Sequence, residues 1–360
     1  MIKYIRPLLL PFAILYGIIV IIRNKCYDWG IFKSRQFDLP VICVGNLAVG
    51  GSGKTPVTEY LVRLLSQYKV AILSRGYGRE TRGFILADAA ATAKSIGDEP
   101  LQYYQKFPQV TVAVCEDRIT GIERLQADHD LIILDDAFQH RKVKPGYSIL
   151  LFEYDKIRRL QWLLPAGDLR EPFPGYKRAQ QILITKSPLI VDEQVKRQIK
   201  GKFSGLNPEK IAYASIQYNR LQPVYASSPA NTTIERAGTV FLLTGIANTK
   251  PLLQYLEGEY RQVIQHRYPD HHKFNTSEIK SLVQAFDSYP DREKLIITTE
   301  KDAQRLLDAS IKDLLLNLPV FFLPIKVDIH AADQLKFNQE ILTYVSKHTR
   351  DRSIYQAKNK

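Results

Sequence analysis

The sequence predicts an α/β fold in which helices flank a mostly parallel sheet, joined to a second, smaller α/β domain and an N-terminal membrane-associated helix. The first observation is the stretch from Leu39 to Tyr68, where an apolar β-branched run, a glycine-rich loop and an amphipathic helix follow one another. The second is a series of further short apolar runs that each end in a polar loop. The third is an uncharged segment from Leu8 to Ile22. A strand, a glycine-rich loop and a helix in this order are typical of a P-loop NTPase-type sheet.

The glycine-rich loop has the features of a phosphate site. At the start of a helix the first amide N–H groups lack partners and the helix dipole is positive, so an anion is attracted there. Lys54 can reach a β or γ phosphate, and the Thr55 hydroxyl can ligate magnesium. The nucleotide-binding residues that we expect are Gly50, Gly51, Ser52, Gly53, Lys54 and Thr55.

One position departs from the general pattern GxxxxGK[ST]. Its first glycine would fall at position 48, which is Ala48, although Gly45, Gly50 and Gly51 surround it. The alternative interpretation is a glycine-rich turn with an incidental lysine. The flanking strand and helix favour the phosphate site, because they are the context that the motif requires.

A second apolar run supplies acidic residues for a metal ion. Leu131 to Leu134 are four aliphatic residues, and Asp135 and Asp136 follow directly. The carboxyl ends of parallel strands lie along one edge of a sheet, so these carboxylates are expected beside Thr55. There they can hold magnesium or its water ligands, which predicts a metal site of Thr55, Asp135 and Asp136.

The composition is that of an ordinary globular protein with a basic balance of charge. The chain has 360 residues, of which 45% are hydrophobic and 24% charged, and this length favours two domains. The formal charge of +13 indicates attraction to an anionic partner such as nucleic acid, acidic phospholipid or a phosphorylated substrate. The cysteines Cys26, Cys43 and Cys115 form no CxxC pair, which predicts reduced thiols in a cytosolic compartment and no zinc site.

The N-terminal segment narrows the choice of partner. Leu8 to Ile22 contains no charged residue, whereas Lys3, Arg6, Arg23 and Lys25 flank it. It is short for a bilayer span, which needs about 20 residues, and no small-residue cleavage site follows it. We expect an uncleaved anchor that lies in or dips into the cytoplasmic leaflet, with its basic flanks on anionic head groups. The alternative is a helix buried in the protein.

Composition and pattern divide the chain into five parts. A stretch rich in Ser, Pro, Asn and Thr near position 230 indicates a hinge, and a second series of strands and helices begins after it. The parts that we expect are the N-terminal membrane-associated helix (1–30), the P-loop core (31–210), a strand and loop hinge region (211–236), a C-terminal α/β domain (237–345) and a loose basic tail (346–360).

Phosphoryl transfer also needs a group that positions or deprotonates the acceptor. The spare carboxylate is Asp98, in GDEP, and the spare imidazole is His271, in PDHHKF. Such a pair can hold the tautomer of the ring and accept a proton from a sugar hydroxyl, if the two domains close on each other. The alternatives are a helix-capping role for Asp98 and a structural histidine.

Two other loops bear on the substrate. Arg75 lies in SRGYGR, after the apolar run from Val70 to Leu73, where it can bind an anion or close on the substrate; a solvated turn is the alternative. A guanine-specific NTPase would be expected to carry an aspartate two residues after Lys186, and this chain has Pro188 there. A GTPase is therefore disfavoured.

Eight motifs in this order resemble the tetraacyldisaccharide 4′-kinase family of lipid A biosynthesis: VGNLAVGGSGKTP, SRGYGR, GDEP, DDAFQHR, GDLREP, GIANTKP, PDHHKF and TEKDAQRL. The match extends from the N-terminal apolar segment to about Asp308. The resemblance implies a bacterial inner-membrane enzyme, active on the cytoplasmic side, that moves the γ-phosphate of ATP with Mg²⁺ as cofactor. The acceptor it implies is an anionic glycolipid, through the 4′-hydroxyl of a tetraacylated glucosamine disaccharide 1-phosphate. We expect no nucleic acid and no obligate protein partner.

The resemblance also assigns roles by motif. Asp98 and His271 match the proposed base dyad of the family, and Lys54 completes the catalytic set. Cations and polar groups in the other motifs match positions that line the site, where cations can meet phosphate oxygens. The substrate-binding residues that we expect are Arg75, Arg118, Gln139, His140, Arg170 and Glu171. Because His272 follows His271, the sequence leaves open which ring is catalytic.

Two other function classes stand beside this interpretation. One is a membrane-tethered P-loop ATPase switch without a lipid acceptor, but the many polar residues in DDAFQHR, GDLREP and PDHH favour sugar binding. The other is a basic nucleic-acid-binding NTPase, which the apolar segment and the lack of a basic, aromatic-interleaved motif disfavour. The sequence leaves open the acyl chains, the depth of the helix, the oligomeric state and the number of metal ions.

Overall fold

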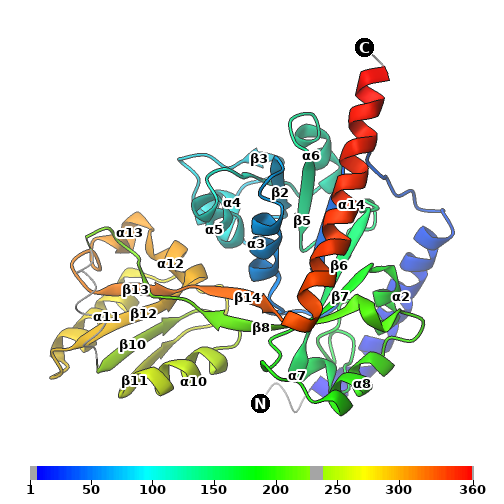
Figure 1. The fold of residues 1–360 in the computed structure, drawn as a ribbon. Coiled ribbons are helices and arrows are strands. Elements are labelled where there is room, and N and C mark those ends of the chain that lie inside the picture. The colour runs from blue at the N-terminus through cyan, green and yellow to red at the C-terminus, as the bar shows by residue number, and fades with distance from the viewer. Residues whose placement is uncertain (1–5, 228–237, 359–360) are drawn as a thin grey trace.

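We describe the protein from a computed structural model, which covers residues 6–227 and 238–358 and, beyond residue 349, the backbone alone. Within that part of the chain, two sheets form, and helices surround both (Figure 1). The larger sheet, on the right of Figure 1, carries the P-loop, and the smaller one lies on the left. The α/β fold predicted from the sequence is confirmed.

The larger sheet has nine strands in the order β14-β8-β7-β6-β1-β5-β2-β4-β3. Strands β8 to β4 in this order run parallel, whereas β14 and β3 at the two edges run antiparallel to their neighbours. The strands are β1 (Val41–Asn46), β2 (Val70–Ser74), β3 (Ile85–Leu86), β4 (Thr111–Val114), β5 (Leu131–Asp135), β6 (Tyr147–Glu153), β7 (Gln181–Thr185), β8 (Ile211–Tyr218) and β14 (Ile325–Ile329).

Helices cover both faces of this sheet because its central strands are apolar on both sides. In β1, Cys43 belongs to one core layer and Ile42 to the other, since successive side chains of a strand point to opposite faces. The first layer packs against α6 (Arg118–Leu125) and α8 (Glu193–Gly201). The second packs against the helices α3 (Lys54–Leu64), α5 (Asp98–Lys106) and α14 (Ala331–Lys358).

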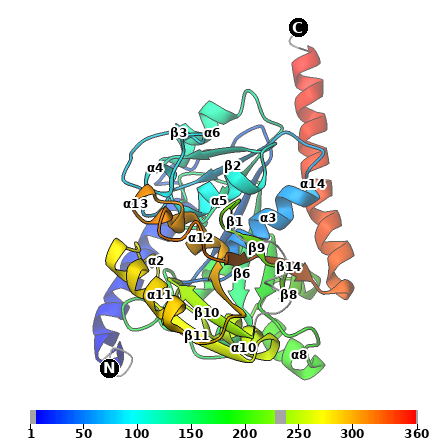
Figure 2. The ribbon, with the colours of Figure 1, turned by 90° about the vertical axis from the view of Figure 1, so that its left-hand side faces the viewer.

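The smaller sheet has five strands in the order β11-β10-β12-β13-β9, and β9 alone is antiparallel to its neighbour. The strands are β9 (Gln222–Pro223), β10 (Thr239–Thr244), β11 (Gln262–Arg267), β12 (Lys294–Thr299) and β13 (Val320–Leu323). The helices that pack on it are α10 (Lys250–Glu259), α11 (Thr276–Ser288), α12 (Glu300–Leu306) and α13 (Ala309–Lys312). Figure 2 shows α12 on the side of this unit that faces α5.

The remaining helical segments are short, apart from one. The short ones are η1 (Arg6–Leu9), α4 (Ala93–Ile96), α7 (Tyr154–Ile157), η2 (Phe173–Arg178) and η3 (Pro208–Lys210). The long one is α2 (Leu10–Asp28) at the N-terminal end of the described chain. Together with η1 it forms a 23-residue apolar segment, which by length and composition alone is a candidate to cross a membrane.

The course of the chain between the two sheets differs from the expected division. Residues 211–218, expected in a hinge, form β8 of the larger sheet, and β14 pairs with residues 214–218 of this strand. Residues from Ile325 to 345, expected in the C-terminal domain, therefore return to the larger sheet. The expected loose tail is helical through Lys358, because it continues α14. Residues 228–236 of the expected hinge lie outside the described residues, and the domain boundaries stay a prediction.

Candidate active site

The P-loop joins β1 to α3 at the carboxyl edge of the larger sheet. Gly50 and Gly53 have φ angles of 100° and 85°, a region that side chains disfavour, and Gly53 is the N-cap of α3. The side-chain amide of Asn46 donates to the Ser52 hydroxyl at 2.8 Å, and the Thr185 hydroxyl donates to the Ser52 carbonyl at 2.7 Å. The loop is therefore held against the sheet at a helix N-terminus, where an anion is favoured.

The missing first glycine falls where the loop is extended. Ala48 forms an antiparallel bridge with Leu169, and the Val49 amide donates to the Asp168 carbonyl at 2.8 Å. Such pairing needs no left-handed backbone, so alanine is tolerated at this position.

Asp136 and the P-loop lysine face each other. The Asp136 carboxylate lies 3.6 Å from the Lys54 ammonium, and Arg170 Nη1 donates to both of its oxygens at 3.1 Å. Burial opposes ionisation, but Lys54 and Arg170 together hold the pKa of Asp136 below its ordinary value. Asp136 has a φ of 49°, a strained conformation that turns its side chain toward these cations.

Asp135 has the properties of a cation ligand. It ends β5 and is 4% exposed, and burial together with the charges of Glu99 and Asp136 raises its pKa to about 7. In the described part of the chain, Asp135 Oδ1 has no hydrogen-bond partner. A divalent cation would satisfy this oxygen and offset the cost of burying the charge.

The donor set at this position suits magnesium. Thr55 lies in the first turn of α3, and the described residues contain no cluster of three or more His, Cys, Asp or Glu side chains that would hold an ion alone. Magnesium is usually bound by one or two carboxylates together with substrate phosphates and water. The residues that fit this role are Thr55, Asp135 and Asp136.

The structure brings Asp98 and His271 together from the two sheets. Asp98 is the first residue of α5, and the N-cap is Gly97, so the alternative of a capping role for Asp98 is wrong. Nδ1 of His271 lies 3.4 Å from Oδ2 of Asp98. His272 instead contacts the Glu278 carboxylate, at 2.9 Å. Of the two adjacent rings, it is that of His271 that faces the carboxylate of Asp98.

Sequence reasoning missed two cations beside this pair. Arg305 Nε donates to Asp98 Oδ2 at 3.0 Å, and Lys301 Nζ lies 3.0 Å from His271 Nε2. Burial favours the neutral acid, but hydrogen bonds from His271 and Arg305 hold the pKa of Asp98 at about 2. Both cations lie in the TEKDAQRL motif, which was the available signal, but the motif alone does not show what they contact.

Of the residues predicted to bind substrate, Arg170 contacts Asp136, and the charge of Arg118 acts on both Asp135 and Asp136. Arg118 is buried, its Nε has no partner within the described residues, and its Nη1 donates to the Cys115 carbonyl at 3.1 Å. Burial and the charge of Arg118 lower the pKa of His140 to about 4, so this ring is neutral at pH 7. Arg75 is exposed, and its charge acts on Arg118.

The carboxylate of Glu171 already accepts hydrogen bonds from three other side chains of the protein. It accepts hydrogen bonds from Arg178 at 2.7 Å, from Gln139 at 2.9 Å and from Asn24 of α2 at 3.2 Å. Gln139 also donates to the Asn46 carbonyl, just before the P-loop. These contacts place Gln139 and Glu171 between the N-terminal helix and the P-loop, and their role in substrate binding stays a prediction.

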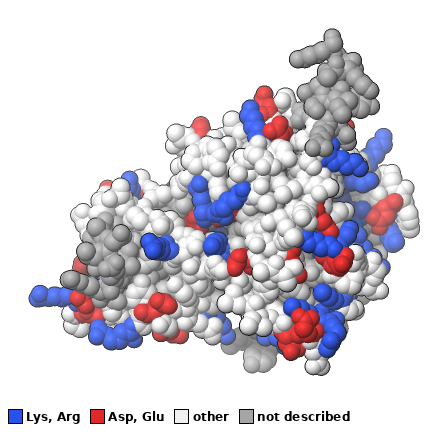
Figure 3. Space-filling model, viewed as in Figure 1, with Lys and Arg blue, Asp and Glu red and all other residues white. Residues whose placement is uncertain are grey.

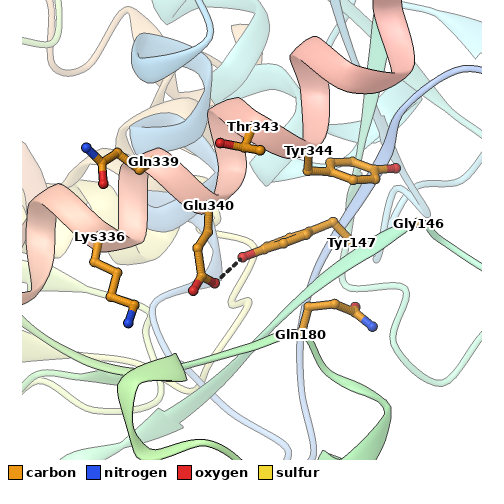
Figure 4. A pocket seen from close by; sticks show the side chains of 8 residues that line it. All are labelled: Gly146, Tyr147, Gln180, Lys336, Gln339, Glu340, Thr343 and Tyr344. Atoms are coloured by element: carbon orange, nitrogen blue, oxygen red, sulfur yellow. Dashed lines mark hydrogen bonds between the residues drawn. The ribbon is translucent and has the colours of Figure 1, made fainter. Parts of the chain in front are cut away.

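A shallow groove lies elsewhere, between α14 and the larger sheet (Figure 4). Tyr147, the first residue of β6, contacts Glu340 there through its hydroxyl at 3.2 Å. Because β6 runs parallel to β1, the groove is at the opposite edge of the sheet from the P-loop. It is therefore separate from the candidate active site.

Comparison with known proteins agrees with this geometry. The model of the family described as tetraacyldisaccharide-1-P 4′-kinase matches residues 5–346. A tetraacyldisaccharide 4′-kinase of Bacteroides thetaiotaomicron is 42% identical over 99% of this chain and 97% of its own length. One of Flavobacterium johnsoniae is 42% identical over 96% of this chain and 98% of its own length.

A solved structure is also similar. The crystal structure of LpxK from Aquifex aeolicus in complex with ATP covers 95% of this chain and 99% of its own, with a TM-score of 0.70 and 29% identity. The match therefore includes both sheets and the chain segments that join them. The chain described here belongs to the tetraacyldisaccharide-1-P 4′-kinase family.

Proposed function

We propose that this chain transfers the γ-phosphate of ATP to the 4′-hydroxyl of a tetraacylated glucosamine disaccharide 1-phosphate. Its family and the names of its relatives support this reaction. The observation that supports it most is that Asp98 and His271 meet at the start of α5, next to Glu99. Glu99, the neighbour of Asp98, is close enough to Asp135 for its charge to raise the pKa of that carboxyl.

The roles of the residues follow from this arrangement. The amides of Gly50 to Gly53 and the Lys54 ammonium bind and orient the phosphates of ATP. Thr55, Asp135 and Asp136 would hold magnesium, which would supply positive charge to neutralise the phosphate oxygens. The Asp98–His271 pair orients the sugar hydroxyl and takes up its proton as the bond to phosphorus forms.

We further propose that the chain works at the cytoplasmic face of the bacterial inner membrane, where its anionic glycolipid substrate lies. The inner face of α2 is fixed to the protein: the Tyr16 hydroxyl donates to the Arg170 carbonyl at 2.6 Å, and Arg23 donates to the Gln139 carbonyl at 2.8 Å. The outer face carries exposed apolar side chains, namely those of Phe12, Leu15, Ile18, Ile19 and Ile22, and Leu8 of η1 is exposed as well.

This geometry supports a helix that lies in the membrane surface over one that crosses it. A spanning helix would have to leave the protein and lose contacts along its length, including the packing of Gly17 against Leu163. A flat helix keeps these contacts and buries its apolar face among the lipids. It would also hold the substrate-binding loops at the level of the lipid head groups.

The distribution of charge on the face that Figure 3 shows disfavours nucleic acid as the anionic partner. Lys and Arg residues there are interspersed with Asp and Glu, without the continuous basic surface that nucleic acid requires. The ATPase switch without a lipid acceptor is not favoured, because relatives across nearly the whole chain are named as kinases.

The test is a direct assay of the purified full chain in detergent. We expect transfer of label from γ-labelled Mg-ATP to a tetraacyl disaccharide 1-phosphate, detected as a labelled lipid. A disaccharide that already carries a 4′-phosphate is the matched control and should accept no label. ATP hydrolysis without a labelled lipid would overturn the kinase assignment.

A further inference from the structure

We propose that Lys301 and Arg305 of α12 are positioning residues that fix the protons of the Asp98–His271 pair. Lys301 keeps Nε2 of His271 free of a proton, and Arg305 keeps Asp98 ionised. The proposal deepens the proposed function, on which it rests for the catalytic role of the pair.

Three ion pairs connect helix α12 to helix α5. Arg305 pairs with Asp98, Lys301 with Glu99 at 2.9 Å, and Glu300 with Lys106 at 2.7 Å. Figure 1 and Figure 2 both show the two helices side by side, with α12 on the smaller sheet and α5 on the larger. When the two helices are read in opposite directions along the chain, each charge on α5 faces a charge of the opposite sign on α12. This interface sets where Lys301 and Arg305 lie.

The first step concerns the histidine. A lysine ammonium can only donate, so Nε2 of His271, 3.0 Å from Lys301 Nζ, must accept. The proton of the neutral ring then resides on Nδ1, which faces Asp98 Oδ2 at 3.4 Å. The ring of Tyr77, 5.0 Å away, and the hydrogen bond from the His271 amide to the Gly245 carbonyl hold the ring in this place.

The second step concerns the carboxylate. Arg305 contacts Asp98 Oδ2 through Nε and Nη2, while its Nη1 donates to Asp302 Oδ1 at 2.7 Å and to the Gly245 carbonyl at 3.2 Å. The planar guanidinium therefore connects α5, α12 and the loop after β10 through hydrogen bonds of fixed geometry. Within the described residues, these hydrogen bonds fall on Oδ2, which leaves Oδ1 of Asp98 to meet the sugar hydroxyl.

Of the surrounding charges, those of Lys301 and Arg305 on α12 favour the ionised state of Asp98. The acidic neighbours, Glu99 on α5, Asp302 on α12 and Asp270 on the loop after β11, interact with these two cations. The other neighbours are the His272 carbonyl, which accepts from Arg305, and the ring of Tyr77 on the loop after β2. Burial raises the pKa of Asp98, whereas His271 and Arg305 lower it to about 2. When Arg305 is removed, fewer interactions counteract the effect of burial, so the pKa of the Asp98 carboxyl rises.

The reaction step balances with these assignments. The O–H bond of the sugar breaks and its proton passes to Asp98 Oδ1, while the sugar oxygen forms the new bond to the γ-phosphorus. The bond between that phosphorus and the bridging oxygen breaks, and its electron pair leaves with ADP. His271 keeps its Nδ1 proton throughout and stabilises Asp98 through it.

The experiment compares Lys301→Met and Arg305→Met with Glu300→Gln, a matched control in the same helix and interface. In Arg305→Met the acid limb of the pH profile of kcat/KM should move to higher pH by about one unit or more, and Arg305→Lys should restore part of the shift. Glu300→Gln should leave the profile in place. A uniform loss of activity with an unmoved acid limb would overturn the role of Arg305.

Lys301 is tested by a readout that does not depend on activity. In protein labelled with ¹⁵N-histidine, one of the seven histidines should show an Nδ1–H tautomer that disappears in His271→Asn. In Lys301→Met this signature should be lost or changed, whereas Glu300→Gln should keep it. An unchanged signature in Lys301→Met would overturn the proposal even if the kinase assay succeeds, and a failed kinase assay would leave this measurement interpretable.

Discussion

Oδ2 of Asp98 lies 3.4 Å from Nδ1 of His271, although the two residues belong to different sheets and lie more than 170 positions apart in the chain. The contact depends on how the smaller sheet packs on the larger one. Catalysis by this pair would therefore respond to the interface between α5 and α12 as well as to the two side chains.

Asp98→Asn and His271→Ala should each lower kcat by about 10²-fold or more, which is the lower range for loss of a general base. Affinity for ATP should stay close to that of the unchanged protein, because neither side chain is part of the P-loop. Turnover and ATP binding are measured on the same preparations. Glu80→Gln is the control, since Glu80 also joins the two parts of the chain, through Lys273, but is exposed. Full turnover in both variants would remove the pair from the mechanism.

Two substitutions in the P-loop, one that removes a glycine and one that introduces a glycine, should affect ATP binding differently. Gly53→Ala forces a side chain into a left-handed backbone conformation, at a cost of about 1–2 kcal/mol, while a Cβ there would meet Thr185 only at an ordinary 3.7 Å. We expect ATP affinity, measured by calorimetry, to fall by about tenfold. Ala48→Gly restores the general motif but should change this affinity by less than about twofold, because Ala48 is in a bridged, extended segment. A gain from Ala48→Gly would show that the missing glycine is a defect.

Asp135→Asn should stabilise the metal-free protein but impair its activity. Burial and neighbouring carboxylates raise the pKa of Asp135 to about 7, so its charged form opposes folding when no cation is bound. At pH 8 in EDTA, the variant should melt several degrees above the unchanged protein, whereas its activity should require much more magnesium. Asp313→Asn, at an exposed position on the smaller unit, should change neither property. A lower melting temperature in EDTA would contradict the view that this carboxylate is held ready for a cation.

The sequence was sufficient for the parts of the fold that local pattern determines. Apolar runs predicted β1 before the P-loop and β5 before Asp136, and the amphipathic pattern after the loop predicted α3. It was not sufficient for the return of the chain to the larger sheet. The four residues of β13 are all apolar, whereas Lys326 and Asp328 alternate with apolar residues in β14, and Pro324 separates the two strands. This local pattern marks two strands, but it does not show that they belong to different sheets.

The same limit applies to the site. Motifs predicted which residues would face phosphate and metal, because each motif is a short pattern of strand and loop that can be recognised from the sequence. The contacts of Arg305 with Asp98 and of Lys301 with His271 depend on how the two units pack against each other. The spacing of these residues along the chain therefore does not predict the contacts.

The two tryptophans of the chain test how α2 meets the membrane. Trp29, 71% exposed, caps the C-terminal end of α2, and Trp162, 48% exposed, lies beside Leu163, which touches Gly17 in the middle of the helix. If α2 lies flat, both rings reach the head-group level, where tryptophan is favoured.

We expect vesicles with acidic lipids brominated high on the acyl chain to quench the fluorescence of both single-tryptophan variants, Trp29→Phe and Trp162→Phe. Lipids brominated near the bilayer centre should quench both weakly. The same variants in vesicles without bromine are the control for changes caused by binding alone. A helix that crosses the bilayer would give a different pattern, because the protein body and Trp162 would then stand away from the lipids. Quenching of Trp29 alone would therefore contradict a flat helix, since the contacts of α2 with the loops around Leu163 and Arg170 do not let the two rings separate.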